Sequence, residues 1–345
     1  MTPAPPLSAL PLSAPLLSVE DLRVTFATPR GTVRAVDGAG ISVGAGEVVG
    51  LVGESGSGKS VTLRAVSRLL RGSATVSGRV LWRGRDLLDM PEAALRAVRG
   101  REIAMIFQEP MAALNPVLTI GQQIDESLAA HGTLDARARR ARALELLDLV
   151  GIAAGPQRLR SYPHEFSGGM RQRAMIAIAL APQPMLLLAD EPTTALDVTI
   201  QDQVLQLLLR LAGELGMAMV LVTHDLGVVA ETCSRVCVMY AGRVVEAGPV
   251  AALFAQPRHA YTAALLRSMP GTGPARRPLV PIPGQPPRLD QAIPGCPFVP
   301  RCGFVEERCR TFAPPLAEVA PMHPGSGHRA ACWASDRVAA QEAVP

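Results

Sequence analysis

The octapeptide Gly53-Glu54-Ser55-Gly56-Ser57-Gly58-Lys59-Ser60 decides the fold of this chain. It follows an apolar stretch, residues 48–52, that predicts a buried strand, and it opens a helical pattern over residues 59–70. Glycines here let the backbone wrap around a phosphate chain, and the following helix points its positive end at the same anion. Lys59 is expected to reach the β- and γ-phosphates, and the Ser60 hydroxyl to bind Mg²⁺. The octapeptide therefore predicts a nucleotide site.

Lysine usage supports the same interpretation. Lys59 is the only lysine in the chain, and every other basic residue is arginine. A GC-rich coding bias explains arginine at surface positions, where either side chain supplies the charge. A phosphate cradle closes around a compact ammonium, which the wide guanidinium fork does not replace. A Gly/Ser-rich turn that carries a lysine by chance is the alternative.

The composition limits which classes of protein this chain can belong to. The 345 residues are 48% hydrophobic, which suffices for a sizeable core, and 3% aromatic, which argues against a base-stacking nucleic-acid surface. The net charge of +4 does not require a polyanionic partner. No apolar run is long enough for a transmembrane helix, and the proline-broken N-terminus does not fit a signal peptide. We therefore expect a cytosolic chain.

Proline divides the chain. Fifteen of the 31 prolines lie in residues 270–345, whereas the middle alternates short apolar strands with helical patterns. The prediction is a disordered tail over residues 1–17, an α/β domain over 18–268, and a loop-rich Pro/Cys extension over 269–345. Strands are expected at residues 18–26, 48–52, 103–107, 185–189, 218–222 and 236–240. Helices are expected at residues 59–70, 120–150 with a break near Gly132, 170–180 and 199–215.

Two acids end the apolar strand at residues 185–189. Asp190 suits a contact to Mg²⁺ through water, and Glu191 can orient or deprotonate the attacking water. An ordinary surface cap is the alternative for two adjacent acids. Together with the octapeptide, the pair indicates a P-loop NTPase.

The segment Phe166-Ser167-Gly168-Gly169-Met170-Arg171-Gln172-Arg173 narrows the class. Ser167, Gly168 and Gly169 open a helix, so a hydroxyl and free N–H groups lie at its positive end, suited to a phosphate held by a second subunit. A simple N-cap is the alternative. The segment resembles the signature of ABC ATPases, with Phe166 in place of the usual Leu and Met170 in place of the usual Gln.

Further segments resemble other motifs of that family and occur in the same order along the chain. Gln108 resembles its Q-loop glutamine, which senses Mg²⁺ and contacts the membrane subunit, and residues 194–197 resemble its D-loop, ending in Asp197. His224 resembles the switch histidine that holds the γ-phosphate, and Phe26 lies where the family stacks an aromatic ring on adenine. The resemblance implies an ABC-type fold with a RecA-like core, an N-terminal antiparallel β-subdomain and a helical subdomain that carries the signature. It also implies an ATPase whose head-to-tail partner binds ATP in trans through Ser167–Met170.

Three stretches resemble the dipeptide, oligopeptide and nickel importer ATPases in particular: residues 107–116, 162–165, and 257–262 followed by the Pro-rich residues 281–284. This resemblance implies a peripheral subunit on the cytoplasmic face of the cell membrane, bound to two permeases and served indirectly by a solute-binding protein. The cargo is expected to be peptides, with nickel or another small solute as the alternative. The partner ATPase is the same chain or a related one. A soluble ABC protein acting on ribosome or DNA is the alternative from another class.

The extension carries a cysteine set of its own. Its members, spaced C-x5-C-x6-C-x22-C, are Cys296, Cys302, Cys309 and Cys332. Four thiolates in a cytosolic, loop-rich segment suit a metal clip that replaces a missing core. The spacing favours a [4Fe–4S] cluster over structural zinc, with free thiols as the third alternative. Cys233 and Cys237 are expected in the core, and His328 in a surface loop.

Overall fold

The computed structural model of this protein describes residues 14–29, 31–70, 72–194, 196–269, 281–319 and 327–342. The chain forms two compact units. The first comprises Met1–Ser42, Val48–Leu88 and Thr223–Pro345, and the second comprises Val43–Glu47 and Asp89–Val222. The predicted domains follow the sequence in order, whereas the first unit is assembled from three separate segments.

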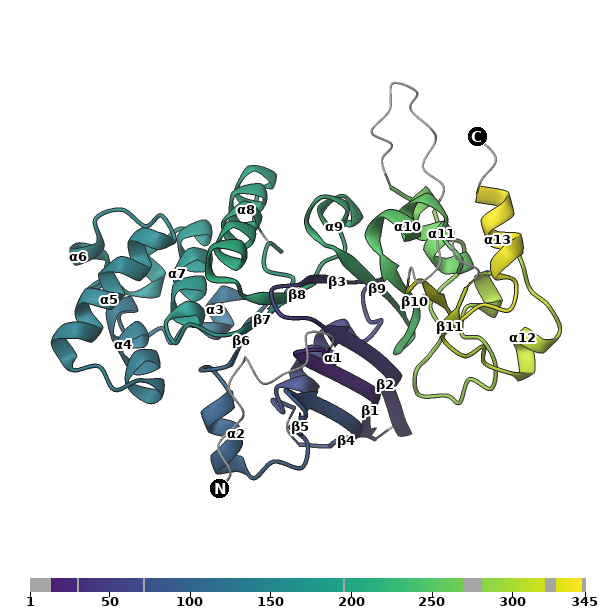
Figure 1. The fold of residues 1–345 in the computed structure, drawn as a ribbon, viewed down its shortest axis with the longest axis horizontal. Helices are drawn as coiled ribbons and strands as arrows, with labels where there is room; N and C mark the ends of the chain where they lie inside the picture. The colour runs from purple at the N-terminus through teal and green to yellow at the C-terminus, as the bar shows by residue number, and fades with distance from the viewer. Residues whose placement is uncertain are drawn as a thin grey trace. The chain divides into compact units, whose positions relative to one another are not determined.

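The first unit contains an antiparallel sheet of order β2-β1-β4-β5. Its strands, visible together in Figure 1, are β1 (Leu17–Thr28), β2 (Gly31–Val43), β4 (Ala74–Trp82) and β5 (Arg85–Asp86). The register of β1 against β4 shifts between Glu20 and Arg23. Because a bulge adds one residue, the alternation of buried residues in β1 skips a position there, from Val19 to Leu22. This sheet is the predicted N-terminal antiparallel subdomain.

A second set of strands in the first unit carries the phosphate-binding loop. Strand β3 (Val48–Val52) runs parallel to β9 (Arg235–Tyr240), and β10 (Arg243–Pro249) is antiparallel to β9. The extension adds β12 (Arg329–Ala330) to β10 and β11 (Ala317–Glu318) to β12. The extension therefore continues the hydrogen bonding of this sheet.

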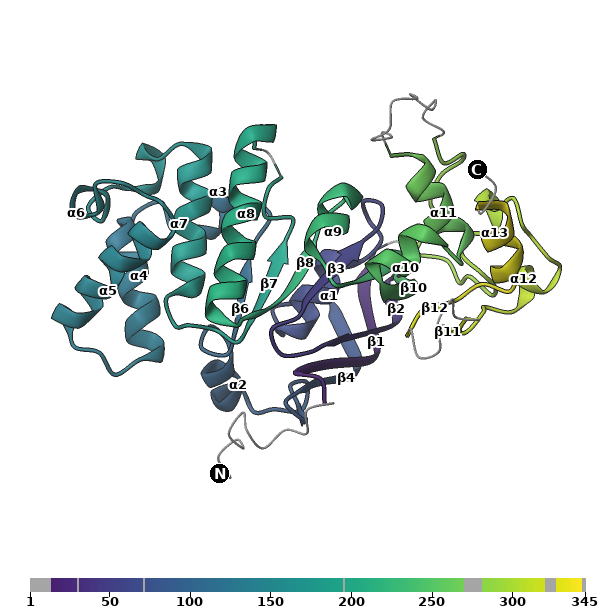
Figure 2. The same cartoon turned by 45° about the horizontal axis from the view of Figure 1, so that its top comes forward.

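Short helices complete the first unit. They are α1 (Lys59–Val66), α9 (Leu226–Thr232), α10 (Val250–Ala255), α11 (Ala260–Arg267), α12 (Arg308–Thr311) and α13 (Ser335–Glu342), with a 3-10 turn η3 (Val299–Arg301). Helices α11 and α13 lie side by side in Figures 1 and 2. Helix α1 ends earlier than predicted, at Val66, because Arg68 takes a left-handed backbone conformation with φ of 49°.

The second unit contains three parallel strands in the order β6-β7-β8, namely β6 (Ile103–Ile106), β7 (Leu186–Asp190) and β8 (Ala218–Val222). Every residue of β7 and β8 is buried, as is typical of parallel strands covered on both faces. Its helices are α2 (Glu92–Val98), α3 (Pro110–Ala113), α4 (Ile120–His131), α5 (Ala136–Leu149), α6 (Gly155–Arg158), α7 (Gly168–Leu180) and α8 (Val198–Leu215), with a 3-10 turn η2 (Pro163–Glu165). Figure 1 shows α4, α5 and α6 grouped with α7.

The N-terminal boundary differs from expectation. The predicted tail over residues 1–17 is too long, because Leu16 and Leu17 are 2% and 1% exposed and β1 begins at Leu17; residues 1–13 lie outside the described residues. Cys233 and Cys237 are buried, as predicted. Among the described residues, no helix has both the length and the apolar character needed to cross a bilayer.

Candidate functional site

The phosphate-binding loop leaves β3 and enters α1, as its sequence predicts. The Lys59 side chain is 5% exposed, and its ammonium donates to the carbonyls of Gly53 and Glu54 at 2.8 and 3.0 Å. The Ser57 hydroxyl lies 3.5 Å from the same nitrogen. The only lysine of the chain is therefore folded back over the loop that carries it.

Two glycines of this loop have no room for a side chain. Gly53 has a φ of 150°, and a Cβ there would lie 2.2 Å from the Met239 carbonyl oxygen. Gly58 has a φ of 104°, and its Cβ would lie 2.5 Å from the Ala35 carbonyl oxygen. Backbone conformation and close approach both require glycine at these positions. The neighbouring strands thus determine the path of the loop.

Helix α1 presents its positive end at this loop. Gly58 caps the helix in a left-handed conformation, and the first turn holds no acidic residue. Lys59 and Ser60 are its first two residues, so the Ser60 hydroxyl lies at the helix N-terminus. Free N–H groups and the helix dipole favour an anion at this end.

The remaining predicted residues of the first unit lie on β1 and beside α9. Phe26 pairs with Ala74 in the β1–β4 ladder and is half-buried. His224 is exposed directly before α9, whose N-cap Asp225 accepts from the backbone N–H groups of Gly227 and Val228. The capped first turn of α9 fixes the backbone next to His224.

In the second unit, the two predicted catalytic side chains meet. The Gln108 amide donates to Oε2 of Glu191 at 3.0 Å, and the Thr194 hydroxyl donates to the same oxygen at 2.9 Å. Glu191 has a φ of 45°, a left-handed conformation that is rare outside glycine and tends to occur at functional sites. Asp190, at the end of β7, is fully buried. The contact from Thr194 was missed; its only sequence signal is a hydroxyl three residues after the acid.

The signature segment begins α7. Ser167 is its N-cap and accepts from the Met170 N–H at 3.3 Å, while Ser167 and Gly168 are exposed. A Cβ on Gly169 would lie 2.8 Å from Cγ2 of Ile200 in α8. Asp197 caps α8 and accepts from the Ile200 N–H. Ser167 therefore caps α7 while it and Gly168 stay exposed at the N-terminus of that helix.

The four cysteines of the extension line one cavity. Phe298, Phe304, Trp333 and His259 form other parts of its wall. Burial raises the pKa of Cys296 and of Cys332 to about 11, and that of Cys302 in the same direction. No group of three or more His, Cys, Asp or Glu side chains with the arrangement of a metal site occurs in the described part of the chain. The structure brings the four cysteines together without forming a single-ion site.

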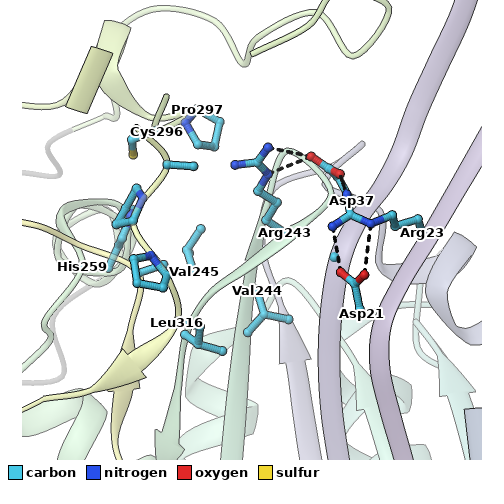
Figure 3. Close-up of a pocket in the computed structure, with 15 residues that line it drawn as sticks. Asp21, Arg23, Asp37, Arg243, Val244, Val245, His259, Cys296, Pro297 and Leu316 are labelled. Atoms are coloured by element: carbon cyan, nitrogen blue, oxygen red, sulfur yellow. Dashed lines mark hydrogen bonds and ion pairs between the residues drawn. The ribbon is translucent and has the colours of Figure 1, made fainter. Parts of the chain in front are cut away.

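A pocket of about 340 Å³ lies next to this cavity, and Cys296 and His259 line both. Figure 3 shows a row of charges on its opposite wall, formed by Asp21, Arg23, Asp37 and Arg243. Each of these charges is paired within the row: Arg23 with both acids, and Arg243 with Asp37 at 2.6 Å. The pocket therefore offers no uncompensated charge from this row.

Sequence reasoning missed two residues around the loop. The Tyr261 hydroxyl accepts from the Glu54 N–H at 2.8 Å, and the Arg301 guanidinium binds both carboxylate oxygens of Glu54 at 2.8 and 2.9 Å. The predicted surface position of His328 is wrong: it is 6% exposed, and its Nε2 lies 2.7 Å from Oε1 of buried Glu246. All these contacts join residues far apart in the sequence, so no local sequence pattern predicts them.

Comparison with known proteins identifies the family. The family model described as "ABC transporter" matches residues 36–194, and that described as "Oligopeptide/dipeptide transporter, C-terminal region" matches residues 245–309. The chain is 51% identical over 326 residues to a probable peptide ABC transporter ATP-binding protein of Sinorhizobium fredii, covering 94% of this chain and 96% of that protein. This chain belongs to the peptide ABC transporter ATP-binding proteins. The resemblance stated from its motifs is confirmed.

Further relatives of this ABC protein agree. The oligopeptide transport ATP-binding protein OppD of Mycobacterium tuberculosis is 49% identical over 333 residues, which cover 96% of this chain and 54% of OppD. Among solved structures, an ATP-binding cassette dimer in a post-hydrolysis state with ADP and phosphate matches with a TM-score of 0.61 and 30% identity, covering 68% of this chain and 98% of that one. The predicted ABC cassette fold is confirmed.

Proposed function

We propose that this chain is the ATP-hydrolysing subunit of an importer that takes up peptides. The observation that carries the proposal is the loop from Gly53 to Ser60, whose glycines, lysine and helix N-terminus together form a phosphate cradle. Lys59 and the loop N–H groups bind the β- and γ-phosphates, and Phe26 stacks on adenine. The relatives named above carry peptide import in their names, which supports the cargo class.

Glu191 activates the attacking water. Its carboxylate is oriented by Gln108 and Thr194, each donating one hydrogen bond to Oε2, and it accepts a proton from the attacking water. His224 holds the γ-phosphate. The oxygen donors Ser60, Gln108 and Asp190 suit Mg²⁺, which prefers oxygen ligands and neutralises phosphate charge when bound. The roles of these residues are those of their counterparts in the ABC family.

The exposed signature at Ser167–Met170 binds the ATP held by a second ATPase subunit. Such a dimer, of identical or related chains, closes on ATP and drives two permeases at the cytoplasmic face of the membrane; a solute-binding protein delivers the cargo. The cassette dimer among the structural relatives supports this arrangement. Nickel or another small solute is the alternative cargo. Action on ribosome or DNA is disfavoured by the scarcity of aromatic residues.

The replacement Glu191→Gln tests the mechanism. An amide accepts no proton from water, so we expect hydrolysis to fall at least about a hundredfold while ATP still binds. Hydrolysis and the equilibrium Kd for ATP are to be measured on the full chain reconstituted with its permeases. Glu145→Gln, on exposed α5, is the matched control. Undiminished turnover of Glu191→Gln would remove Glu191 from the role of base.

We also propose that the four cysteines of the extension hold a cofactor, with a [4Fe–4S] cluster preferred over zinc. Support comes from their convergence on one cavity, with aromatic side chains that exclude water from it. The raised pKa of Cys296 means that the thiols must lose protons on binding, so the affinity falls with acidification. The cofactor would then serve as a structural clip for a segment with few core residues.

Anaerobic purification tests this proposal. The expected result is broad visible absorbance with about four iron atoms per chain. The matched control replaces buried Cys237, outside the cavity, by Ala and should keep the iron, whereas Cys309→Ala should lose it. One zinc per chain without iron would favour zinc, and a metal-free chain would leave free thiols.

A further inference from the structure

The side chain of Arg301 connects the extension to the phosphate-binding loop. It is 4% exposed, and all five of its N–H donors find acceptors. Two go to the carboxylate of Glu54, one to the Tyr240 hydroxyl at 3.3 Å, and two to the carbonyls of Pro283 and Ile282. A bidentate pair of this kind fixes orientation as well as charge. Arg301 is therefore held in one position from four sides.

Glu54, the second residue of the loop, is fixed twice. Its carboxylate binds Arg301, and its backbone N–H donates to the Tyr261 hydroxyl at 2.8 Å. Tyr261 is fully buried in α11. The N-cap of that helix is His259, whose Nδ1 accepts from the Tyr261 N–H, and burial lowers the pKa of His259 to about 3, which keeps it a neutral acceptor. Both partners of Glu54, Arg301 and Tyr261, are thus themselves held by hydrogen bonds or by burial.

An aromatic cluster holds these anchors together. Tyr240, Tyr261 and Phe298 have ring centroids 4.6 to 5.5 Å apart. The Arg301 guanidinium lies 5.8 Å from the ring centroids of both Tyr240 and Phe298. Such contacts between a cation and aromatic faces stabilise Arg301 where it is shielded from water. The cluster joins β9, α11 and the extension directly beneath Glu54.

The charge of Glu54 gives this arrangement a function. The loop must accept a polyanion, and a carboxylate on its second residue repels phosphate unless a cation compensates it. Arg301 binds both oxygens of this carboxylate and supplies such a cation. We propose that Arg301 is a positioning residue of the nucleotide site, which neutralises Glu54 and holds the phosphate-binding loop in its binding conformation. This inference rests on the proposed ATP site.

The arrangement also explains two sequence motifs that the ATPase mechanism leaves unused. Residues 257–262 supply Tyr261 and its capping histidine, and residues 281–284 supply the two carbonyls that orient Arg301. Both stretches therefore act on the phosphate-binding loop. The extension is thereby made part of the nucleotide site.

The experiment measures the Kd for ATP on the full chain, with wild type, Arg301→Gln, Glu54→Gln and the double variant. Removing Arg301 leaves a half-buried carboxylate uncompensated, so Arg301→Gln should raise the Kd about tenfold. Glu54→Gln in the Arg301→Gln background removes the uncompensated charge, so the double variant should bind ATP about threefold more tightly than Arg301→Gln alone, and the remaining deficit measures the lost anchor of the loop. Arg301→Lys keeps the charge but not the fork, and should fall between wild type and Arg301→Gln.

The control variant is Arg308→Gln, which breaks an ion pair with Glu306 inside the same extension and should leave the Kd unchanged. Thermal unfolding of every variant separates folding from binding. An unchanged Kd in Arg301→Gln, or a loss that Glu54→Gln does not rescue, would overturn the proposal. Wild-type protein that binds no ATP would instead overturn the proposed function.

Discussion

The phosphate-binding loop and the C-terminal extension of this protein differ in how far apart their interacting residues lie in the sequence. Lys59 makes its hydrogen bonds to residues two to six positions away. Arg301 binds Glu54 across 247 positions, and His328 binds Glu246 across 82. The Lys59 ammonium is therefore held by its own loop, whereas the extension obtains its structure from contacts with the domain it follows.

Glu246 illustrates how the extension is anchored. Its carboxylate is fully buried and accepts from the N–H groups of Arg258 and His259, while His328 of the extension lies at 2.7 Å. Next to His328, β12 pairs with β10, the strand that carries Glu246. A segment rich in proline thus gains order from one buried carboxylate and one short ladder. Three substitutions test this difference between the loop and the extension.

The largest effect is expected from Lys59→Arg. The wide guanidinium cannot occupy the space beside the carbonyls of Gly53 and Glu54 that the ammonium fills, so ATP affinity should fall at least about a hundredfold. Equilibrium binding of ATP to the full chain checks this. The matched control is Arg64→Lys, the reverse exchange at an exposed position of the same helix, which should bind normally. Wild-type affinity in Lys59→Arg would contradict the need for a compact ammonium in this loop.

An intermediate effect is expected from Glu246→Ala. The change leaves the buried N–H groups of Arg258 and His259 and the ring of His328 without their acceptor, and should cost about 3 kcal/mol of unfolding free energy. Urea unfolding measures it. Glu318→Ala, at an exposed position of β11, should change stability by less than about 0.5 kcal/mol. Equal stabilities of the two variants would show that the extension does not depend on the buried carboxylate.

The smallest effect concerns Cys233, a core cysteine. Burial raises the pKa of its thiol from the ordinary value of 9.0 to about 11, so the folded state holds the proton more tightly than the unfolded state. This contribution is complete below pH 9 and is lost as the pH rises from 9 toward 11. At pH 10 wild type should lose about 1 kcal/mol more than Cys233→Ala, relative to each protein at pH 8. Parallel pH dependences by urea unfolding would contradict the assigned burial.

Much of the fold follows from local patterns. The buried strand at residues 48–52 and the helical pair on either side of Gly132 were predicted because apolar runs and helical periodicity are local signals. Strands β2, β4 and β10 were not among the predicted ranges. Strand β2 contains Gly31, Gly38 and Gly40, and much of β4 is exposed, so neither shows a simple apolar alternation. Their pairing with β1 stabilises them, which is a tertiary effect.

The candidate site divides in the same way. The loop and Glu191 were predicted from contiguous motifs whose residue types suit phosphate and water chemistry, and Gln108 and the signature from their resemblance to motifs of the ABC family. The hydrogen bond between Gln108 and Glu191 spans 83 positions and is visible only in the folded structure. Thr194 lies in the D-loop match and Tyr261 in the stretch 257–262, but neither match assigns the hydrogen bonds that these side chains make. Arg301 lies outside every motif. The hydrogen bonds of all three depend on which residues the fold brings next to their side chains.

The sequence by itself determined the class of this protein, because phosphate binding needs a particular local backbone and one compact ammonium. It also predicted that the four cysteines of the extension lie together, through their number and spacing, and they line one cavity. Only the tertiary structure decided that Arg301 of the extension pairs with Glu54 of the loop and that His328 is buried against Glu246. Ion pairs between distant segments form where packing excludes water, and no local pattern records which distant partner will compensate a buried charge.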